Sequence, residues 1–137
     1  MKAIVYVEGK SSSPIRETSG IKCLKSEDLS SLPVAVYEEI ELIDVLEFDE
    51  NPDVLSIAIQ KLRHNGTIRI GGTDALEIMR ESERGRMDMS SASEHLLNGR
   101  MRLTSAHELK DRLLQMQMNV STVSIGGLRY LVEATRP

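Results

Sequence analysis

The clearest pattern in the chain is an apolar strand, an amphipathic helix and a second apolar strand, in that order. Apolar side chains are dense over residues 39–46. We read this density as too high for a sheet with one face in water, so we expect a central parallel strand. Apolar positions then recur at helical spacing over residues 51–66, and residues 67–70 form the next strand. This order predicts a βαβ unit, which places ligands at the carboxyl ends of its strands.

Capping residues mark where the predicted helices begin and end. Asn51 is suited to cap the first helix, and Pro52 to its first turn. Gly66 is suited to end it in a left-handed conformation. Thr73 is expected to cap a second helix. Ser105 and Glu108 have the spacing of a capping box, which predicts a helix running to about Met118.

The remaining segments predict shorter elements. Residues 3–7 and 21–24 are expected to be strands, with a polar loop or single turn over residues 26–32. Residues 81–103 are charged and interrupted by glycine, so we expect an irregular or mobile insert with a helical turn near residues 93–97. Residues 119–135 alternate and contain two adjacent glycines, which predicts an antiparallel hairpin.

Composition limits the classes of partner. The 137 residues are 40% hydrophobic, which is enough for one domain spanning residues 1–137. A net charge of −4 and an aromatic content of 3% argue against nucleic acid and against an anionic membrane. One cysteine, Cys23, forms no disulfide within the chain, which favours a cytoplasmic location. The histidines are too far apart for a metal motif, so no metal site is expected.

Five segments resemble motifs of the class I S-adenosylmethionine-dependent methyltransferases. Ile43-Asp-Val-Leu-Glu-Phe48 is similar to the "vLEH" segment, and residues 62–70 resemble "vLkpGGtlri". Residues 72–76 resemble "pD-x-L", and residues 25–33 resemble "D-l…LP". The closing part of the chain, residues 109–123 followed by residues 128–137, resembles "L…l…f-v…l-v-a-rP". The resemblance covers residues 21–137. It implies an α/β, reduced Rossmann-like fold of five or six strands, with a mostly parallel sheet and a C-terminal antiparallel hairpin.

The front of the cofactor site departs from that family. Its members hold the cofactor on a "D-x-G-x-G" turn, where glycine lets the backbone approach the ligand. The matching residues here, 7–14, contain one glycine, Gly9. The distance from Gly9 to Asp28 is 28 − 9 = 19 residues, too short for a helix, a strand and another helix. We therefore expect the second strand, with the acid that holds the ribose, to be deleted.

If cofactor binding is retained, the resemblance implies contacts at five positions. Glu8 and Gly9 would form the remnant turn, Asp28 and Leu29 would lie beside the adenine, and Asp44 would lie at the end of the central strand. Other readings stay open for two of these positions. Gly9 also suits a strand that exits into a loop, and Asp28 also suits a loop acid or a cap.

Two carboxylates near the end of the central strand are further candidates. Asp44 and Glu47 could position a substrate, act as a base or bind a divalent cation, or belong to a solvated acidic rim. The histidine of the family's motif is replaced by Phe48, which weakens an acid–base role. No catalytic residue is assigned. The turn at Gly71 and Gly72 could receive an anion at a helix N-terminus, or permit a tight turn.

These observations favour a methyltransferase-like protein that has lost S-adenosylmethionine binding and acts as an interaction or assembly module. Loss of the second strand would expose a sheet edge, and exposed edges are covered or paired. We therefore expect a homo-oligomer or a protein partner, with Met87, Met89 and Met101 as candidate contacts. The alternative is an active, minimal S-adenosylmethionine-dependent methyltransferase that acts on a small molecule or a sugar.

Overall fold

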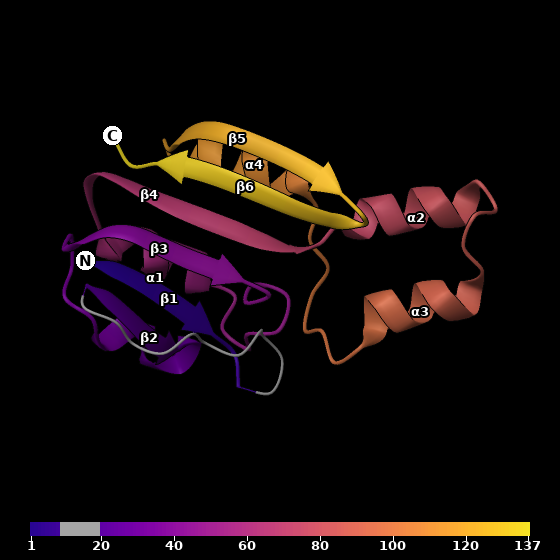
Figure 1. Ribbon diagram of the computed structural model, residues 1–137, viewed down its shortest axis with the longest axis horizontal. Helices are drawn as coiled ribbons and strands as arrows, with labels where there is room; N and C mark the ends of the chain where they lie inside the picture. The colour runs from indigo at the N-terminus through magenta and orange to yellow at the C-terminus, as the bar shows by residue number, and fades with distance from the viewer. Residues whose placement is uncertain (9–19) are drawn as a thin grey trace.

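A mixed sheet of six strands forms the centre of the part of the chain that the structure describes (Figure 1). The computed structural model describes residues 1–8 and 20–137. In spatial order the strands are β2 (Ile21–Lys25), β1 (Lys2–Tyr6), β3 (Tyr37–Ile43), β4 (Leu62–Thr73), β6 (Arg129–Thr135) and β5 (Asn119–Gly126). The first four are parallel, and β6 is antiparallel to both of its neighbours. The predicted fold class, a mostly parallel sheet with a C-terminal antiparallel hairpin, is confirmed.

The helices form one layer and one projecting arm. The 3-10 helix η1 (Ser26–Ser31) and the helices α1 (Val54–Lys61) and α4 (Ala106–Gln115) lie against the same face of the sheet (Figure 1). The helices α2 (Ala75–Glu83) and α3 (Met89–Leu97) project beyond the end of the sheet. The core therefore lies between the sheet and the layer formed by η1, α1 and α4. Its fully buried side chains include Ile40, Leu42, Leu55, Ile68, Ile70 and Leu113.

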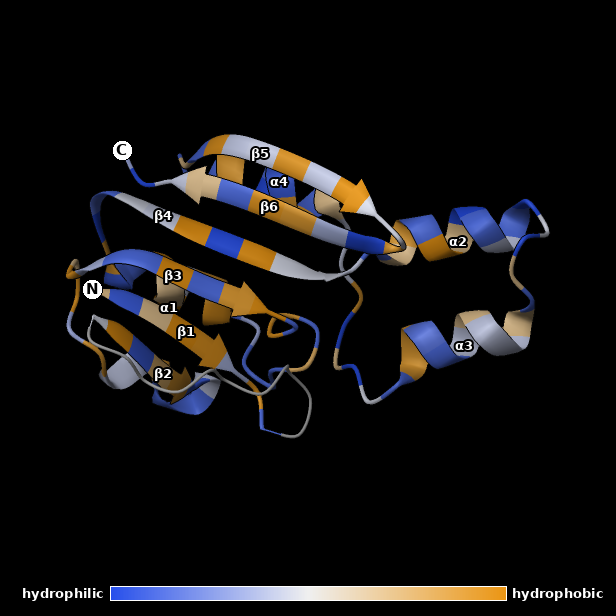
Figure 2. Cartoon of the chain, viewed as in Figure 1, coloured by the Kyte–Doolittle hydropathy of each residue, from blue (hydrophilic) through white to orange (hydrophobic). Residues whose placement is uncertain are grey.

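The opposite face of the sheet carries charged side chains and no described helix. The amine of Lys2 lies 3.2 Å from Glu39 and 3.7 Å from Glu41, and the guanidinium of Arg69 lies 2.9 Å from Glu133. Figure 2 shows the resulting alternation of hydrophilic and hydrophobic residues along β3 and β6. The expectation that residues 39–46 are too apolar for a half-solvated strand was wrong. β3 is central, but its alternate side chains face away from the core.

The first helix and the strand after it differ from the predicted boundaries. α1 ends at Lys61, and β4 begins at Leu62, five residues before the predicted start. Gly66 does not end the helix: it lies inside β4, and the left-handed residue is Asn65, with φ of 63°. The reason is sheet pairing, because Tyr37 of β3 is in register with Leu62. Pairing across the sheet draws these residues into the strand despite their helical pattern.

Two capping predictions have different outcomes. Ser105 caps α4 and accepts a hydrogen bond from the Glu108 amide, as the capping box predicts. Thr73 does not cap α2, because the cap is Asp74. The insert at residues 81–103 is more regular than predicted, although residues 84–88 and 98–103 have no regular secondary structure. α2 extends to Glu83, and α3 is a regular helix whose cap, Asp88, accepts from the Ser91 amide.

One described strand, β2, lies beyond β1 in the sheet. The doubly wound order 3-2-1-4-5-6 has two strands on that side of the first strand. The described sheet thus has one strand fewer on that side, and the deletion of the second strand stays a prediction because residues 9–19 lie outside the described residues. β1 is nevertheless not an edge, because β2 pairs with it in register from Lys2 to Tyr6. The edges of the described sheet are β2 and β5.

Candidate functional site: the carboxyl ends of the parallel strands

A hollow of about 410 Å³ lies at the carboxyl ends of β1 and β2, the edge where ligands bind in open α/β sheets. Its walls come from the segments that follow β1, β2 and β3 and from the segment that follows α3. The residues that line it are Val7, Glu8, Lys25, Ser26, Glu27, Phe48, Asp49, Glu50, Gly99 and Met101.

Six of the ten described residues that line the hollow are charged or polar, and the other four are apolar or glycine. Four of its side chains, those of Glu8, Glu27, Asp49 and Glu50, are carboxylic acids, and Lys25 is the cation among its described residues. The Glu8 carboxylate lies 2.9 Å from the Lys25 amine and raises the pKa of that amine, chiefly by accepting its hydrogen bond. This ion pair connects the ends of β1 and β2. The lining favours a cationic group over an anionic one.

The structure separates the five predicted cofactor contacts. Glu8 lines the hollow, and Gly9 lies outside the described residues. Asp28 is exposed on η1 and lines a different hollow beside β2. Leu29 is 1% exposed and packs in the hydrophobic core. Asp44 is directed toward the C-terminal hairpin through its ion pair, so Glu8 is the one described member of the set that lines the main hollow.

Asp44 connects β3 to β6 instead of lining the hollow. It has a left-handed backbone, with φ of 55°, directly after the last residue of β3. Both of its carboxylate oxygens face the guanidinium of Arg129, at 2.9 and 3.0 Å. This two-point geometry is the one that orients a carboxylate most firmly.

Glu47 forms a buried polar cluster with residues far away in the sequence. Its side chain is 1% exposed, and one carboxylate oxygen accepts hydrogen bonds from the Tyr130 hydroxyl at 2.7 Å and from the Thr104 hydroxyl. The second oxygen, Oε2, is buried and makes no hydrogen bond with the described residues. A Cβ at Gly72 would overlap this carboxylate, so glycine provides the space. Burial, and then the Glu47 charge, raise the pKa of Tyr130 far above its usual range, so its hydroxyl stays a neutral donor.

Two arginines fasten the segment after α3 to the ends of the strands. Arg100 donates to the Thr73 hydroxyl at 2.9 Å and lies 5.1 Å from the centre of the Phe48 ring. Arg102 donates to the backbone oxygens of Leu46 and Asp49. These contacts place residues 99–101 as one wall of the hollow.

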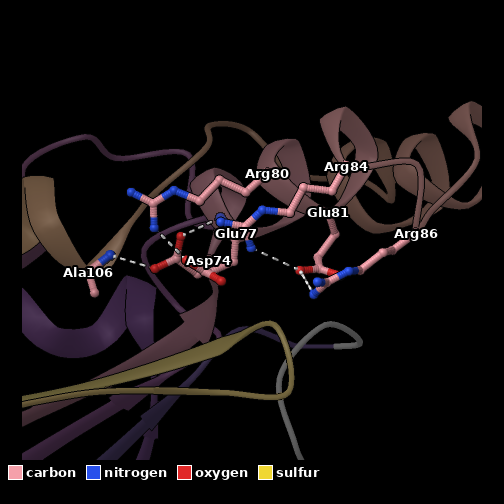
Figure 3. Close-up of polar contacts among 7 residues, drawn as sticks. All are labelled: Asp74, Glu77, Arg80, Glu81, Arg84, Arg86 and Ala106. Atoms are coloured by element: carbon pink, nitrogen blue, oxygen red, sulfur yellow. Dashed lines mark hydrogen bonds and ion pairs between the residues drawn. The ribbon is translucent and has the colours of Figure 1, made fainter.

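Asp74 is a buried acid with a structural role. It is 1% exposed, and each of its carboxylate oxygens accepts a backbone amide hydrogen bond: Glu77 at 3.1 Å and Ala106 at 3.0 Å. Figure 3 shows this carboxylate between the first turns of α2 and α4. The same carboxylate therefore fills the N-terminus of α2, where an external anion was one reading of the turn at Gly71 and Gly72.

Several of these residues were not selected from the sequence. Lys25, Glu27 and Glu50 gave no signal beyond lying near predicted strand ends. Glu47 has two partners that are distant in the chain: Thr104 is 57 residues away and Tyr130 is 83 residues away. No local pattern connects positions so far apart.

The described residues hold neither a metal-binding cluster nor a helix suited to a bilayer. No group of three or more histidine, cysteine, aspartate or glutamate side chains is placed to hold a metal ion in residues 1–8 and 20–137. Over the same residues, no helix has the length and apolar character required to cross a bilayer.

Comparisons with known proteins identify the fold. Comparisons with protein-family models and with curated protein sequences give no match. One similar solved structure is a methyltransferase of Thermotoga maritima, described as a possible histamine N-methyltransferase. Its sequence is 19% identical and its TM-score is 0.61, and the match covers 86% of this chain and 65% of that one. A methyltransferase of Aquifex aeolicus is 18% identical with a TM-score of 0.58, over 85% and 55%.

A third similar structure contains a second protein. It is a complex from Haloferax volcanii between the methyltransferase activator Trm112 and a putative methyltransferase, at 13% identity and a TM-score of 0.60, over 89% of this chain and 64% of that one. This chain thus spans about 55 to 65% of the length of these three structures. It has the fold of the class I S-adenosylmethionine-dependent methyltransferases, as the sequence motifs predicted.

Proposed function

We propose that this protein is a methyltransferase-like scaffold that does not bind S-adenosylmethionine and acts by binding protein. The observation that carries the proposal is the charged face of the sheet. Doubly wound sheets have helices on both faces, and their central strands are apolar on both sides. Here the face without a described helix carries Lys2, Glu39, Glu41, Arg69 and Glu133. Charged residues at these positions suit a sheet that works without its second helical layer.

The lining of the hollow supports the same proposal. Pockets for small molecules are mostly apolar, with a few polar groups that fix orientation. Here Val7, Phe48 and Met101 are the three large apolar side chains among the described lining residues. The ion pair between Glu8 and Lys25 lies across the strand ends where a nucleoside would be held. This ion pair and the three further carboxylates of the lining make the described part of the hollow a poor match for a nucleoside.

A protein partner has support of a different kind. One structure with this fold is a complex with a methyltransferase activator. The arm of this chain also exposes apolar side chains, since Met89 and Leu97 are each 73% exposed. Met101, in the segment after α3, is 57% exposed. Exposed methionine is common on surfaces that bind proteins.

An active minimal methyltransferase is the second candidate. The hollow has the position and the volume of a cofactor site, and its carboxylates would complement the positive sulfonium of S-adenosylmethionine. Under this proposal Glu8 and Gly9 are the candidate cofactor contacts, because Asp28 and Asp44 lie away from the hollow and Leu29 is buried in the core. The acceptor would be a small molecule or a sugar. A cytoplasmic location and a single domain over residues 1–137 are part of both proposals.

Calorimetric titration separates the two candidates. We expect no saturable heat from S-adenosylmethionine or S-adenosylhomocysteine at ligand concentrations up to about 1 mM, corresponding to less than about 4 kcal/mol of binding free energy. A dissociation constant in the micromolar range would overturn the main proposal. In that case the Glu27→Gln variant tests whether the ligand occupies the hollow, with the exposed Glu108→Gln as the matched control.

A further inference from the structure

The two edges of the described sheet differ in how well they resist pairing. β2 has five residues, two of which are lysines, Lys22 and Lys25. Short length and lysine are common protections of a sheet edge. β5 has eight residues, Asn119 to Gly126, with no charged residue and no proline. Figure 1 shows β5 as the outermost strand, with no described segment along its outer side. β5 therefore lacks the short length and the lysines that protect β2, and its one irregularity, a register shift between Val120 and Thr122, lies at its beginning and leaves residues 122–126 regular.

Two apolar side chains of β5 are exposed on the helix side of the sheet. Val123 and Ile125 are 42% and 46% exposed. They are in register with Val132 and Tyr130 of β6, whose side chains are buried in the core. On the same side, Leu114 of α4 is 49% exposed. A long uncharged edge beside exposed apolar groups has the character of an unpaired interface.

We infer that β5 pairs with β5 of a second copy of this chain, antiparallel and about a two-fold axis at Ser124. In that register Val123 lies opposite the partner's Ile125, and Ile125 lies opposite the partner's Val123. Residues directly opposite in an antiparallel pair lie on the same face. The four apolar side chains would therefore form one cluster on the helix side, and the two six-stranded sheets would become one continuous sheet.

A second copy suits this edge better than an unrelated strand for two reasons. The alternation of Val123, Ser124 and Ile125 is symmetric about its central residue, so one register satisfies both copies at once. β5 also carries no charged residue, so pairing two copies through β5 places no like charges of the two strands against each other, although each copy has a net charge of −4. The inference rests on the proposed function, because it names the partner of the assembly module.

Light scattering across a range of protein concentrations tests the pairing. The wild-type chain is expected to have twice its mass of 15.3 kDa. Val123→Lys places two like charges beside the axis and is expected to weaken the dimer by at least about 100-fold. Ile21→Lys adds the same charge to the opposite edge strand and is the matched control, with an unchanged mass. A Val123→Lys variant that remains a dimer while folded would overturn the inference.

Cross-linking tests the register itself. With Cys23 replaced by serine, Ser124→Cys is expected to form an intermolecular disulfide under mild oxidation, because the two residues face each other at the axis. Ser121→Cys is the control. It lies three residues from the axis, so its counterpart is about 20 Å away at about 3.4 Å per residue, beyond the reach of a disulfide. Equal cross-linking by both variants would contradict the register.

The outcomes separate this inference from the proposed function. A wild-type chain that is a monomer at every concentration overturns the β5 pairing, whatever the ligand titration gives. A dimer that binds S-adenosylmethionine keeps the pairing and overturns the loss of cofactor binding.

Discussion

Replacing Tyr130 by phenylalanine tests whether the buried cluster around Glu47 stabilises the fold. The change removes the hydroxyl that donates to the Glu47 carboxylate at 2.7 Å and leaves the ring in place. Both side chains are almost fully buried, at 1% exposure for Glu47 and 3% for Tyr130. Water therefore has little access to replace the lost donor.

The expected magnitude follows from the charge on Glu47. A hydrogen bond to a charged group contributes about 1.5–3 kcal/mol, about twice the contribution of a neutral one. The remaining described donor to the Glu47 carboxylate is the Thr104 hydroxyl. Unfolding entropy of about 2.1 cal/mol/K per residue gives roughly 0.29 kcal/mol/K for 137 residues. Tyr130→Phe should therefore lower the midpoint of thermal unfolding by about 5–10 °C.

Urea unfolding at neutral pH gives the free energy directly. Tyr6→Phe is the control, because its hydroxyl lies on a half-buried residue of β1, and its effect should be within about 0.5 kcal/mol. Thr104→Val combined with Tyr130→Phe should give a non-additive loss, since both hydroxyls donate to one carboxylate. A loss below about 0.5 kcal/mol for Tyr130→Phe would refute the reasoning.

The difference in stability between wild type and Tyr130→Phe should depend on pH. Burial raises the pKa of Tyr130 in the folded chain, whereas the unfolded chain releases this proton near pH 10. Above pH 10 the unfolded state therefore binds fewer protons than the folded state. The contribution of Tyr130 to the free energy of unfolding is complete below pH 10. It falls above pH 10 by up to about 1.4 kcal/mol per pH unit. The stability difference between wild type and Tyr130→Phe should narrow from pH 9 to pH 10.5, and a constant difference would contradict the assignment.

Two further predictions concern residues with matched controls. Asp74→Ala removes the carboxylate that accepts amides from α2 and α4, so urea unfolding should show a loss of about 2–4 kcal/mol, compared with about 1 kcal/mol for the single cap lost in Ser105→Ala. Equal losses would show that the double cap adds nothing. Gly72→Ala forces a methyl group against the buried Glu47 carboxylate and should cost about 1–3 kcal/mol. Gly126→Ala, where the added methyl meets nothing within 4 Å, should change stability by less than about 0.5 kcal/mol.

The candidate site shows where prediction from sequence stopped. The segment after the first strand predicts Glu8 as a contact, and Glu8 lines the hollow. Leu29 was selected beside the adenine position, but the structure places it in the core. Asp44 was selected at the end of the central strand, and the structure pairs it with Arg129, 85 residues later. Strand ends can be located from the sequence, but the direction of each side chain depends on partners that are distant in the chain.

The solvation of the sheet face also required the tertiary structure. Glu39 and Glu41 alternate with apolar residues in the sequence, a pattern that fits a strand with one wet face. The dense apolar residues that follow, Val45 and Leu46, lie beyond the end of β3 and made the strand look more buried than it is. The ion pair between Arg69 and Glu133 connects strands that are far apart in the sequence, so neither residue alone indicated the exposed face.

The sequence by itself determined the order of the elements, the cap at Ser105 and the closing hairpin. These features depend on interactions over a few residues, between a side chain and a nearby amide or between neighbouring strands joined by a turn. The tertiary structure alone decided that α1 ends at Lys61, that Asp74 caps two helices and that Glu47 meets Tyr130. Each of these features joins segments separated in the chain, and the free energy of packing them together exceeds the local preferences that the sequence displays.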